Sequence, residues 1–488
     1  MKPTKSLLLS FCVLWITVLP PLANAGVLFT NLVFFSYTNA PNYGWNIEFG
    51  AGHGGALVQG ADGDFYGVTC KGGTVYESDT SPPIYGFGTL FKLTPDGAFT
   101  SLHSFGDVSG DGREPLGNLV RAADGNIYGI TPNGGSLPTS DEGTIYRIST
   151  NGVYTSLYSF GHELAGSDEL HKVYTNTDGG VPYAGIVQGS DGNFYGTTST
   201  LGARDGGTVF QFKPDGTLNT LFTFPYLSDA SYATNGNGPF SELVEGDDGT
   251  FYGTTYWGGA NGAGTVFRIT STGALTTLVS FDVRNGYPTS GLTKGAGGLI
   301  YGSTGSSIYQ VTTNGQLTTL NSFILGPSGL ILGSDGNLYG TTAGDSYNHG
   351  TVFQMKPDGT MTTLYSFGGP DGSTPSGPLV QGKDGYFYGT TTYGGPQWTG
   401  SAGFSGYGTI FRVAILPSFQ SIKQIGGDIN LTLIVMPGQK YLLQYCTDLA
   451  ATDWHNLGDP VTAGNPVPSV LDHLGTDSLR YYRIELLQ

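Results

Sequence analysis

Residues 191–198 read Asp-Gly-Asn-Phe-Tyr-Gly-Thr-Thr, and residues 207–210 read Gly-Thr-Val-Phe. Aromatic and β-branched residues fit the pleated, half-buried surface of a strand. Asp-Gly is typical of tight hairpin turns, because glycine adopts a positive φ without a steric clash. The two segments therefore predict neighbouring strands of one antiparallel sheet, the first of them entered through a tight turn.

Both segments recur along the chain. The first has six intact copies of the form Asp-Gly-x-apolar-Tyr-Gly, and a decayed copy at residues 297–302 brings the count to seven. The intact copies begin at Asp62, Asp124, Asp191, Asp248, Asp335 and Asp384. The Gly-Thr segment also has seven copies, the variant lying at residues 306–309. Self-similarity at this spacing predicts a repeat architecture with one small sheet in each repeat.

A third recurring segment, of the type Leu-Thr-Thr-Leu-Tyr-Ser-Phe, is found only six times and is missing after the last Gly-Thr copy. A similar stretch lies near the start of the chain, at residues 28–35. Four-stranded units in radial array form a propeller. A strand from the N-terminus that completes the last unit removes its free edge. The sequence thus predicts an all-β fold, a seven-bladed β-propeller closed by an N-terminal strand and followed by a small β-sandwich.

Two side chains recur in every copy, the tyrosine before glycine and a threonine three residues after it. We interpret the tyrosines as packing between blades, because each aromatic ring can bury roughly 150–250 Å². The threonines are interpreted as structural hydroxyls, since seven equivalent catalytic groups are an improbable arrangement. The tyrosines are Tyr66, Tyr128, Tyr195, Tyr252, Tyr301, Tyr339 and Tyr388, and the threonines are Thr69, Thr131, Thr198, Thr255, Thr304, Thr342 and Thr391.

These motifs resemble the GloVer (Gloeo/Verruco) tandem repeat of exported bacterial proteins. The resemblance is carried by residues 191–198 and 207–210 and by an Asp-Gly-x-x-Pro segment such as residues 371–375, and it covers about residues 28–413. The repeats also look like those of sensor and lyase propellers. The resemblance implies a surface or exported propeller and no established activity.

The sequence divides into three regions. Residues 1–25 combine Lys2 and Lys5 with a short apolar run and an Ala-Asn-Ala exit, the pattern of a signal peptide for the Sec pathway. Residues 26–416 hold the propeller repeats. In residues 417–488 glycine becomes rarer and strand-like alternation begins, and this region resembles a fibronectin- or immunoglobulin-like sandwich with Trp454 in its core. We expect an extracytoplasmic protein that is secreted, periplasmic or bound to the cell surface.

Charge and cysteine content limit the partners. The formal charge is −17, and removal of Lys2 and Lys5 makes it −19. A surface with this charge repels nucleic acid. After residue 25 no apolar stretch is long enough to span a membrane. Cys70 and Cys446 fall in different predicted domains, so free thiols are the simpler interpretation. We expect a monomer whose partner is a polysaccharide or a surface protein.

The strand order predicts two unlike faces. The connections from the first to the second strand and from the third to the fourth are short, whereas the other connections carry insertions; we call the face with the insertions the long-loop face. Function tends to reside on variable loops over a rigid scaffold, and exposed aromatics can stack on sugar rings. The ligand-binding candidates are Trp45, Trp257, Trp398, Tyr43, Tyr85 and Tyr407, with packing of the loops among themselves as the alternative.

Acidic residues also gather on the long-loop face, namely Asp107, Asp111, Glu114, Glu163, Asp168, Glu169 and Asp178. We interpret them as solvated loop residues rather than a glycosidase pair, which needs two carboxylates at a set separation. Asp107, Ser109 and Asp111 have the spacing that begins a calcium loop, but the twelfth position is Asn118 instead of glutamate. No catalytic residue, metal ligand or cofactor is predicted.

Three functions remain open at this point. The first is a non-enzymatic binding or adhesion protein that takes glycans on its long-loop face. The second is a carbohydrate-active lyase or hydrolase with its site at the mouth of the propeller. The third is a structural scaffold of the cell envelope. An acid with a raised pKa in a deep pocket favours the enzyme, and aromatics on a shallow face favour the binding protein.

Overall fold

The computed structural model describes most of the chain after residue 25. The described residues are 26–35, 55–73, 86–136, 142–161, 177–225, 233–284, 286–322, 326–344, 349–375, 377–396, 398–399, 406–448, 453–464, 468–475, 477 and 480–487. Within them the fold is all-β, apart from two short 3-10 turns, η1 (Ala233–Asn235) and η2 (Ala296–Gly298). The predicted signal peptide lies outside the described residues.

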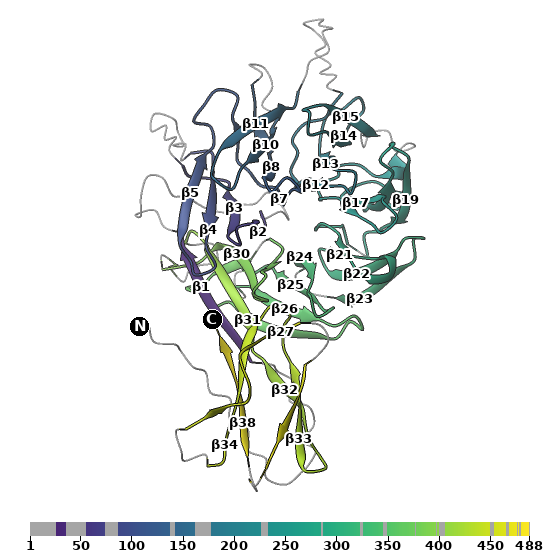
Figure 1. The fold of residues 1–488 in the computed structure, drawn as a ribbon. Coiled ribbons are helices and arrows are strands. Elements are labelled where there is room, and N and C mark those ends of the chain that lie inside the picture. Colours follow the sequence, from purple (N-terminus) through teal and green to yellow (C-terminus); the bar gives the residue numbers. More distant parts are fainter. Residues whose placement is uncertain are drawn as a thin grey trace, which may run out of the picture.

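The repeats form sheets 1 to 7, numbered along the chain (Figure 1). Sheet 1 is β2 (Val58–Gln59), β3 (Phe65–Thr69), β4 (Thr89–Leu93) and β5 (Phe99–Ser104). Sheet 2 is β7 (Val120–Arg121), β8 (Ile127–Thr131), β10 (Thr144–Ile148) and β11 (Tyr154–Ser159). Sheet 3 is β12 (Val187–Gln188), β13 (Phe194–Thr198), β14 (Asp205–Phe212) and β15 (Leu218–Pro225). Sheet 4 is β16 (Val244–Glu245), β17 (Phe251–Thr255), β18 (Thr265–Ile269) and β19 (Leu275–Ser280).

The later repeats follow the same plan. Sheet 5 is β20 (Thr293–Lys294), β21 (Leu299–Thr304), β22 (Ser307–Thr312) and β23 (Leu317–Ser322). Sheet 6 is β24 (Pro327–Leu332), β25 (Leu338–Thr342), β26 (Thr351–Met355) and β27 (Met361–Ser366). Sheet 7 is β28 (Ser373–Pro375), β29 (Val380–Gln381), β30 (Phe387–Tyr393), β31 (Thr409–Ile415) and β1 (Val27–Phe34). A two-stranded ribbon, β6 (Gly112–Arg113) with β9 (Asn133–Gly134), lies beside sheet 2.

All seven sheets are antiparallel, sheets 1 to 6 being simple meanders, and the sheets are arranged around a common centre (Figure 1). Figure 1 shows the short first strands, such as β2, β7 and β12, toward this centre, and the last strands, such as β5, β11 and β19, toward the outside. Strand hydrogen bonds do not join one sheet to the next. The architecture is therefore propeller-like, with separate sheets that meet through side chains.

The predicted N-terminal strand is present at the outer edge of sheet 7. β1 pairs antiparallel with β31, Val27 lying opposite Ile415 and Asn31 opposite Phe411. The ring of Phe29 stacks on that of Tyr365 in sheet 6, with 3.8 Å between their centroids. This pairing confirms the expectation drawn from residues 28–35, and it covers the edge of β31.

Two recurring contacts join neighbouring sheets. In the first contact, a Gln or Glu at the end of a first strand accepts a hydrogen bond of 2.7–2.9 Å from a backbone amide. The amide belongs to the tight turn of the preceding sheet. The four pairs are Gln188 with Ala123, Glu245 with Ser190, Gln381 with Ser334, and Gln59 with Lys383. We call this contact the latch. Repeat tyrosines also lie on a phenylalanine of the next sheet at 3.9–4.3 Å, and Tyr388 packs on Phe65 in this way. Sheets 7 and 1 thus share the contacts that join consecutive sheets.

The recurring tyrosine and threonine side chains have structural roles, as predicted. Six repeat tyrosines donate their hydroxyl to the aspartate four residues earlier, at 2.6–3.1 Å. Tyr301 lies in the decayed copy, where Gly297 stands in place of the aspartate. The threonine of every copy pairs with the first hydroxyl of the following strand at 2.8–3.0 Å, inside the sheet.

The C-terminal region forms two small sheets. One contains β32 (Ser418–Ile425), β33 (Asp428–Ile434) and β37 (Ser469–His473). The other contains β34 (Lys440–Cys446), β35 (His455–Asn456), β36 (Val461–Thr462) and β38 (Tyr481–Leu487). Trp454 is half-buried beneath Arg483, whose guanidinium lies 4.4 Å from the ring. Cys446 and Cys70 are both buried, and neither forms a disulfide within the described part of the chain.

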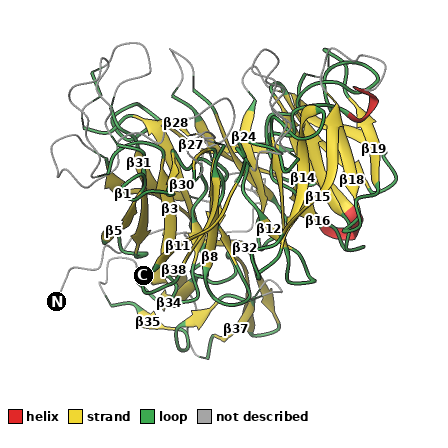
Figure 2. Cartoon of the chain, turned by 90° about the horizontal axis from the view of Figure 1, so that it is seen from above, coloured by secondary structure: helices red, strands yellow, loops and turns green. Residues whose placement is uncertain are grey.

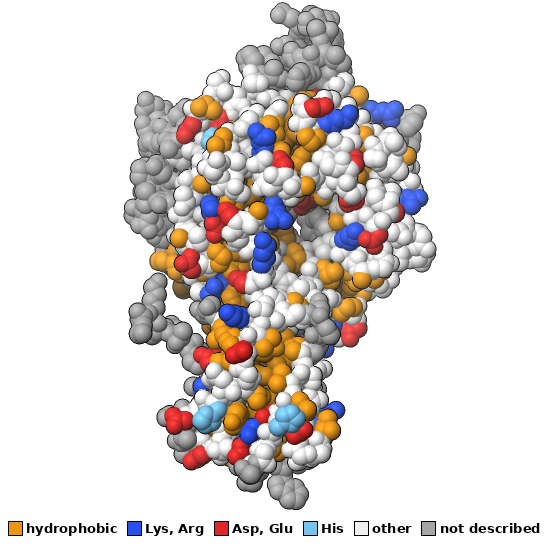
Figure 3. All heavy atoms as spheres, viewed as in Figure 1, with side chains coloured by type: hydrophobic (Ala, Val, Ile, Leu, Met, Phe, Trp, Pro, Cys, Tyr) orange, Lys and Arg blue, Asp and Glu red, His pale blue; other side chains and the backbone are white. Residues whose placement is uncertain are grey.

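The C-terminal sheets dock against sheet 7 through the loop between β33 and β34. Gln439 Nε2 donates to the carbonyl of Ile415 at 2.7 Å, and Met436 is buried in the core cluster of sheets 6 and 7. Figure 2 shows β34, β35 and β37 on the same side of the sheets as the 3-10 turn next to β16, which is the side of the short turns. Apolar side chains gather where the two parts meet (Figure 3). The long-loop face points the other way.

Candidate functional site

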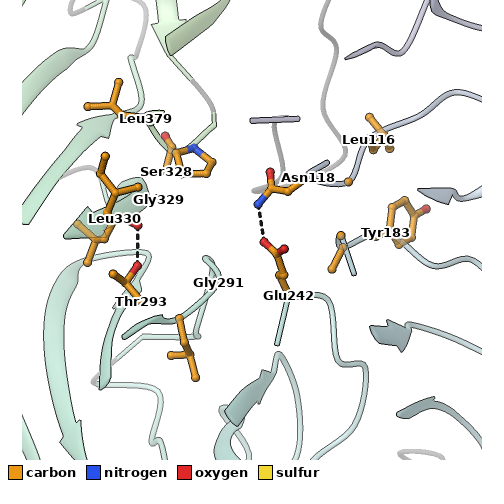
Figure 4. A pocket seen from close by; sticks show the side chains of 16 residues that line it. Leu116, Asn118, Tyr183, Glu242, Gly291, Thr293, Ser328, Gly329, Leu330 and Leu379 are labelled. Carbon is orange, nitrogen blue, oxygen red and sulfur yellow. Dashed lines mark hydrogen bonds between the residues drawn. The ribbon is translucent and has the colours of Figure 1, made fainter. Parts of the chain in front are cut away.

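A cavity of about 200 Å³ lies where the first strands converge (Figure 4). Its walls come from residues that precede or belong to the first strands of sheets 2 to 7. The lining residues are Leu116, Gly117, Asn118, Tyr183, Ala184, Gly185, Glu242, Gly291, Leu292, Thr293, Ser328, Gly329, Leu330, Ile331, Pro378 and Leu379. Because the chain comes from the long-loop face before it enters each first strand, the cavity lies toward that face. We call it the axial cavity.

One position of the repeat supplies six of the sixteen lining residues. At the entry to each first strand stands a Leu or Ile whose side chain points into the core. The position meant here is the residue directly before it. Because side chains alternate along a strand, this residue points toward the axis. Across the seven copies this position holds Ala56, Asn118, Gly185, Glu242, Gly291, Gly329 and Pro378. Five of the seven are small or apolar, which leaves room on the axis. Asn118 and Glu242 are the two polar members.

Asn118 and Glu242 bond to each other across the cavity. Asn118 Nδ2 donates to Glu242 Oε2 at 2.6 Å, and the backbone amide of Ala56 donates to Asn118 Oδ1 at 2.9 Å (Figure 4). The second bond fixes the orientation of the amide. Desolvation raises the pKa of Glu242 to about 7, and the bond from Asn118 offsets only part of this rise. At neutral pH this carboxyl group therefore exchanges its proton readily.

Five aromatic side chains lead from the axial cavity across the long-loop face, and we call them the aromatic row: Tyr183, Phe240, Trp257, Tyr256 and Tyr287. Tyr183 lines the cavity, and its ring centroid is 5.8 Å from that of Phe240. Phe240 meets Trp257 edge-on at 5.3 Å, and Tyr256 stacks on Tyr287 at 5.1 Å. The indole of Trp257 is 37% exposed.

Trp257 is held by its own backbone and by a glycine. Its amide and carbonyl exchange hydrogen bonds of 3.1 and 2.8 Å with Asn237. The indole lies so close to Gly238 that a Cβ at that position would come within 2.7 Å of the ring. Gly238 also has a φ of +62°, which side-chain-bearing residues rarely adopt. The ring is therefore fixed in place although much of it is exposed.

The other predicted binding residues do not join the aromatic row. Trp398 is half-buried in sheet 7, against Gly369 and edge-on to His349 at 5.3 Å. Tyr407 packs against the core cluster between sheets 7 and 1. Trp257 follows β17 of sheet 4, whereas Trp398 and Tyr407 lie between β30 and β31 of sheet 7. Tyr43, Trp45 and Tyr85 lie outside the described residues.

The described acids Asp111, Glu114 and Asp178 of the long-loop face make hydrogen bonds within the fold, and the expectation of solvated loop residues was wrong for Asp111 and Asp178. Asp111 is buried and accepts hydrogen bonds from Tyr154, His103 and the amide of Gly106 at 2.6–2.9 Å. Asp178 is buried and accepts a bond from Tyr158, and Glu114 accepts one from Asn133. Glu163, Asp168 and Glu169 lie outside the described residues. Within the described part of the chain no group of three or more His, Cys, Asp or Glu residues is placed to hold a metal ion.

Sequence reasoning missed Glu242 and Asn118. Glu242 is one acid among many, and its motif Ser-Glu-Leu-Val looks like an ordinary strand entry. An alignment of the seven copies at the position before the buried Leu or Ile supplies the signal, because two polar residues then stand out among alanine, glycine and proline. Tyr183 and Phe240 both precede this position by two residues; Tyr183 lines the cavity, and Phe240 packs beside Tyr183.

The fold and the cavity together define the class, a β-propeller-like repeat protein with an axial site. The sequence matches the Gloeobacter/Verrucomicrobia repeat at residues 24–169, 163–326 and 305–433, so the chain belongs to that family. A search of curated proteins finds no match. Among the described residues no helix is long and apolar enough to cross a membrane.

Solved structures give distant likenesses. Virginiamycin B lyase from Staphylococcus aureus is 16% identical with a TM-score of 0.49, over 79% of this chain and 98% of the lyase. PorZ, a surface component of the type-IX secretion system of Porphyromonas gingivalis, is 11% identical with a TM-score of 0.45, over 85% of this chain and 54% of PorZ. At these values we take neither activity nor ligand from them.

Proposed function

We propose that the protein is an exported, non-enzymatic glycan-binding protein whose ligand enters the axial cavity from the long-loop face. The observation that carries the proposal is the aromatic row, which begins at Tyr183 in the cavity wall and includes the exposed Trp257. Aromatic faces stack on the apolar faces of sugar rings, and a few polar groups in a concave site fix the orientation of a ligand. Glu242 and Asn118 supply those polar groups.

The scaffold of the proposal is a closed ring of seven blades. The latch between Gln59 and Lys383 and the stacking of Tyr388 on Phe65 support it, because the same contacts join consecutive sheets. β1 then serves as the outer strand of the seventh blade. Such a ring holds the seven axial positions at fixed mutual distances, which a binding site needs.

The location and domain plan are part of the proposal. Residues 1–25 act as a signal peptide, residues 26–416 form the propeller, and residues 417–488 form a fibronectin-like sandwich. The partner is a polysaccharide or a glycosylated surface, and the propeller binds it as a monomer. The net charge of −17 supports a partner that is not a polyanion.

A carbohydrate-active enzyme is the second candidate, favoured by one observation. A carboxyl group with a pKa near neutrality is suited to general acid or base catalysis, and Glu242 has a pKa raised to about 7. A glycosidase needs a second carboxylate, and among the described residues that line the axial cavity Glu242 is the only acid. We therefore rank binding ahead of hydrolysis.

The test is a glycan array with the full mature chain, scored for retained ligand and for cleaved products by mass spectrometry. We expect retention without cleavage, lost in Trp257→Ala. Phe34→Ala is the matched control, because Phe34 is also an exposed aromatic, at 41%, but lies on the outer edge strand β1. Cleavage of any glycan would select the enzyme, and neither retention nor cleavage would leave a structural scaffold.

A further inference from the structure

The axial cavity presents one charge with no countercharge. Among the sixteen lining residues Glu242 is the only charged one, and Tyr183 is the only other titratable one. Oε2 of Glu242 accepts the bond from Asn118, while Oε1 has no hydrogen-bond partner among the described residues. A carboxylate in a desolvated site gains most from a ligand that brings a positive charge and N–H donors.

We propose that the axial cavity selects glycans that end in an amino sugar, whose ammonium group pairs with the free oxygen of Glu242. This rests on the proposed function and deepens it, because it names the sugar class. The ammonium donates to Glu242 Oε1. Asn118 cannot turn freely to compete, since the amide of Ala56 holds its Oδ1 at 2.9 Å.

The size of the cavity argues for a single terminal sugar. Its volume of about 200 Å³ corresponds to roughly seven water molecules at ~30 Å³ each. That is below the ~300–1,000 Å³ of pockets that take drug-sized ligands. Gly185, Gly291 and Gly329 provide this space at the axial position. A longer chain therefore cannot be threaded through the cavity, and its remaining rings must lie outside.

The aromatic row accounts for those remaining rings. Tyr183 marks the mouth of the cavity, and Phe240 stands on the same segment as Glu242, two residues earlier. From there the row continues to Trp257, whose indole is fixed and exposed. An oligosaccharide with its terminal ring beside Glu242 thus has a platform for the next rings. The aromatic row therefore binds sugar rings in general, and the carboxylate of Glu242 selects the ring that carries an amine.

Three β-1,4-linked tetramers test the selection, because they differ only at C2: the glucosamine tetramer, the N-acetylglucosamine tetramer and cellotetraose. Their dissociation constants are measured by calorimetry on the full mature chain at pH 7. We expect the glucosamine tetramer to bind at least about ten-fold tighter than the other two, the effect of one hydrogen bond to a charged group. The preference should fall as the pH drops from 7 to 5, because Glu242 then takes up a proton and loses its charge.

Two variants assign the preference to the cavity. Glu242→Gln should lower the affinity for the glucosamine tetramer to that for cellotetraose, while Trp257→Ala should weaken all three tetramers. Glu245→Gln is the matched control, since glutamine already occupies the equivalent latch position at Gln59, Gln188 and Gln381. Equal binding of the three tetramers, or a preference that survives Glu242→Gln, overturns the inference. If none binds, the inference fails, and the glycan array then decides separately whether the proposed function fails as well.

Discussion

At the scale of single residues, the folded protein holds Glu242 where ionisation of its carboxyl group costs free energy. Ionisation of a desolvated carboxyl is unfavourable, so the folded state retains the proton up to a pH of about 7, against an ordinary value of 4.5. Between pH 4.5 and 7 the folded state therefore binds more protons at this site than the unfolded state does. The contribution of Glu242 to stability is fully present below the lower pKa, declines as the pH rises between the two, and is lost above the higher one.

This behaviour predicts a pH-dependent effect of Glu242→Gln. Relative to the wild type, the variant should gain stability on going from pH 4 to pH 8, by about 2 kcal/mol, which is less than the full pKa shift because water reaches the cavity. The measurement is urea unfolding of both proteins at the two pH values. Glu245→Gln serves as the control and should show no such trend. A constant difference between the wild type and Glu242→Gln would contradict the raised pKa.

Two other residues carry buried hydroxyls without a partner. Tyr146 and Tyr309 occupy the aromatic position of the third strand, where the other five copies have phenylalanine, and neither hydroxyl bonds to any described residue. A buried unsatisfied hydroxyl costs about 1–3 kcal/mol. Tyr146→Phe should therefore raise the unfolding free energy by about 1 kcal/mol, measured by chemical denaturation.

The matched substitution is Tyr195→Phe, because that hydroxyl donates to Asp191 at 2.7 Å and accepts from Gln211 at 2.8 Å. It should lower the unfolding free energy by about 1 kcal/mol. The opposite signs separate a lost hydrogen bond from the removal of an oxygen atom as such. If both variants were destabilised alike, the hydroxyl of Tyr146 would have a partner in solution.

At the scale of elements, β1 ties the last repeat to its neighbour. Phe29 on β1 stacks on Tyr365 of sheet 6 and also meets Phe367 and Phe411 at 5.6 Å. Phe29→Ala should cost about 3 kcal/mol through lost contacts and the cavity left behind. Thr30→Ala on the same strand is the control, with an expected cost below about 1 kcal/mol. Thermal unfolding of both proteins is the measurement, and equal midpoints would show that β1 contributes little beyond its own pairing.

The sequence predicted the strands and turns more completely than it predicted the site. Turns, strands and the structural threonines follow from local patterns, because Asp-Gly, Phe-Tyr-Gly and Gly-Thr act within one repeat. The site depends on which residues of different repeats meet at the axis, and that is set by the register of each first strand. Trp257 and Trp398 were grouped because both fall on the predicted long-loop face; they follow strands of sheets 4 and 7, and counting repeats alone would have assigned them to different sheets.

At the scale of the whole molecule, the C-terminal sheets are joined to sheet 7 through closely packed glycines. Gly438 has a φ of +94°, and a Cβ there would meet the carbonyl oxygen of Lys383. Gly458 has a φ of +85°, but a Cβ there would meet nothing within 4 Å. Gly458→Ala thus carries only the conformational cost, of about 1–2 kcal/mol, while Gly438→Ala adds a clash across the junction.

We therefore expect Gly438→Ala to loosen the junction selectively. Amides near Lys383 and Gly385 should exchange faster with deuterium in this variant than in Gly458→Ala, which should leave them at the wild-type rate. Hydrogen exchange read by mass spectrometry is the measurement. Unchanged protection around Gly385 in Gly438→Ala would mean that the two parts unfold independently of this loop.

The single axial residue of each repeat has a consequence for how this scaffold changes over time. The residue at this position decides what each copy displays at the centre of the molecule, but the copies differ in the room they offer. A Cβ at Gly185 would lie 2.6 Å from the carbonyl oxygen of Asn118, and a Cβ at Gly329 would lie 2.9 Å from the ring of Pro378. Gly291 has room for a larger side chain, because a Cβ there would meet nothing closer than 3.8 Å. Substitutions at the axial positions with enough room can therefore replace one recognition chemistry by another, while the sheets that carry these positions stay the same.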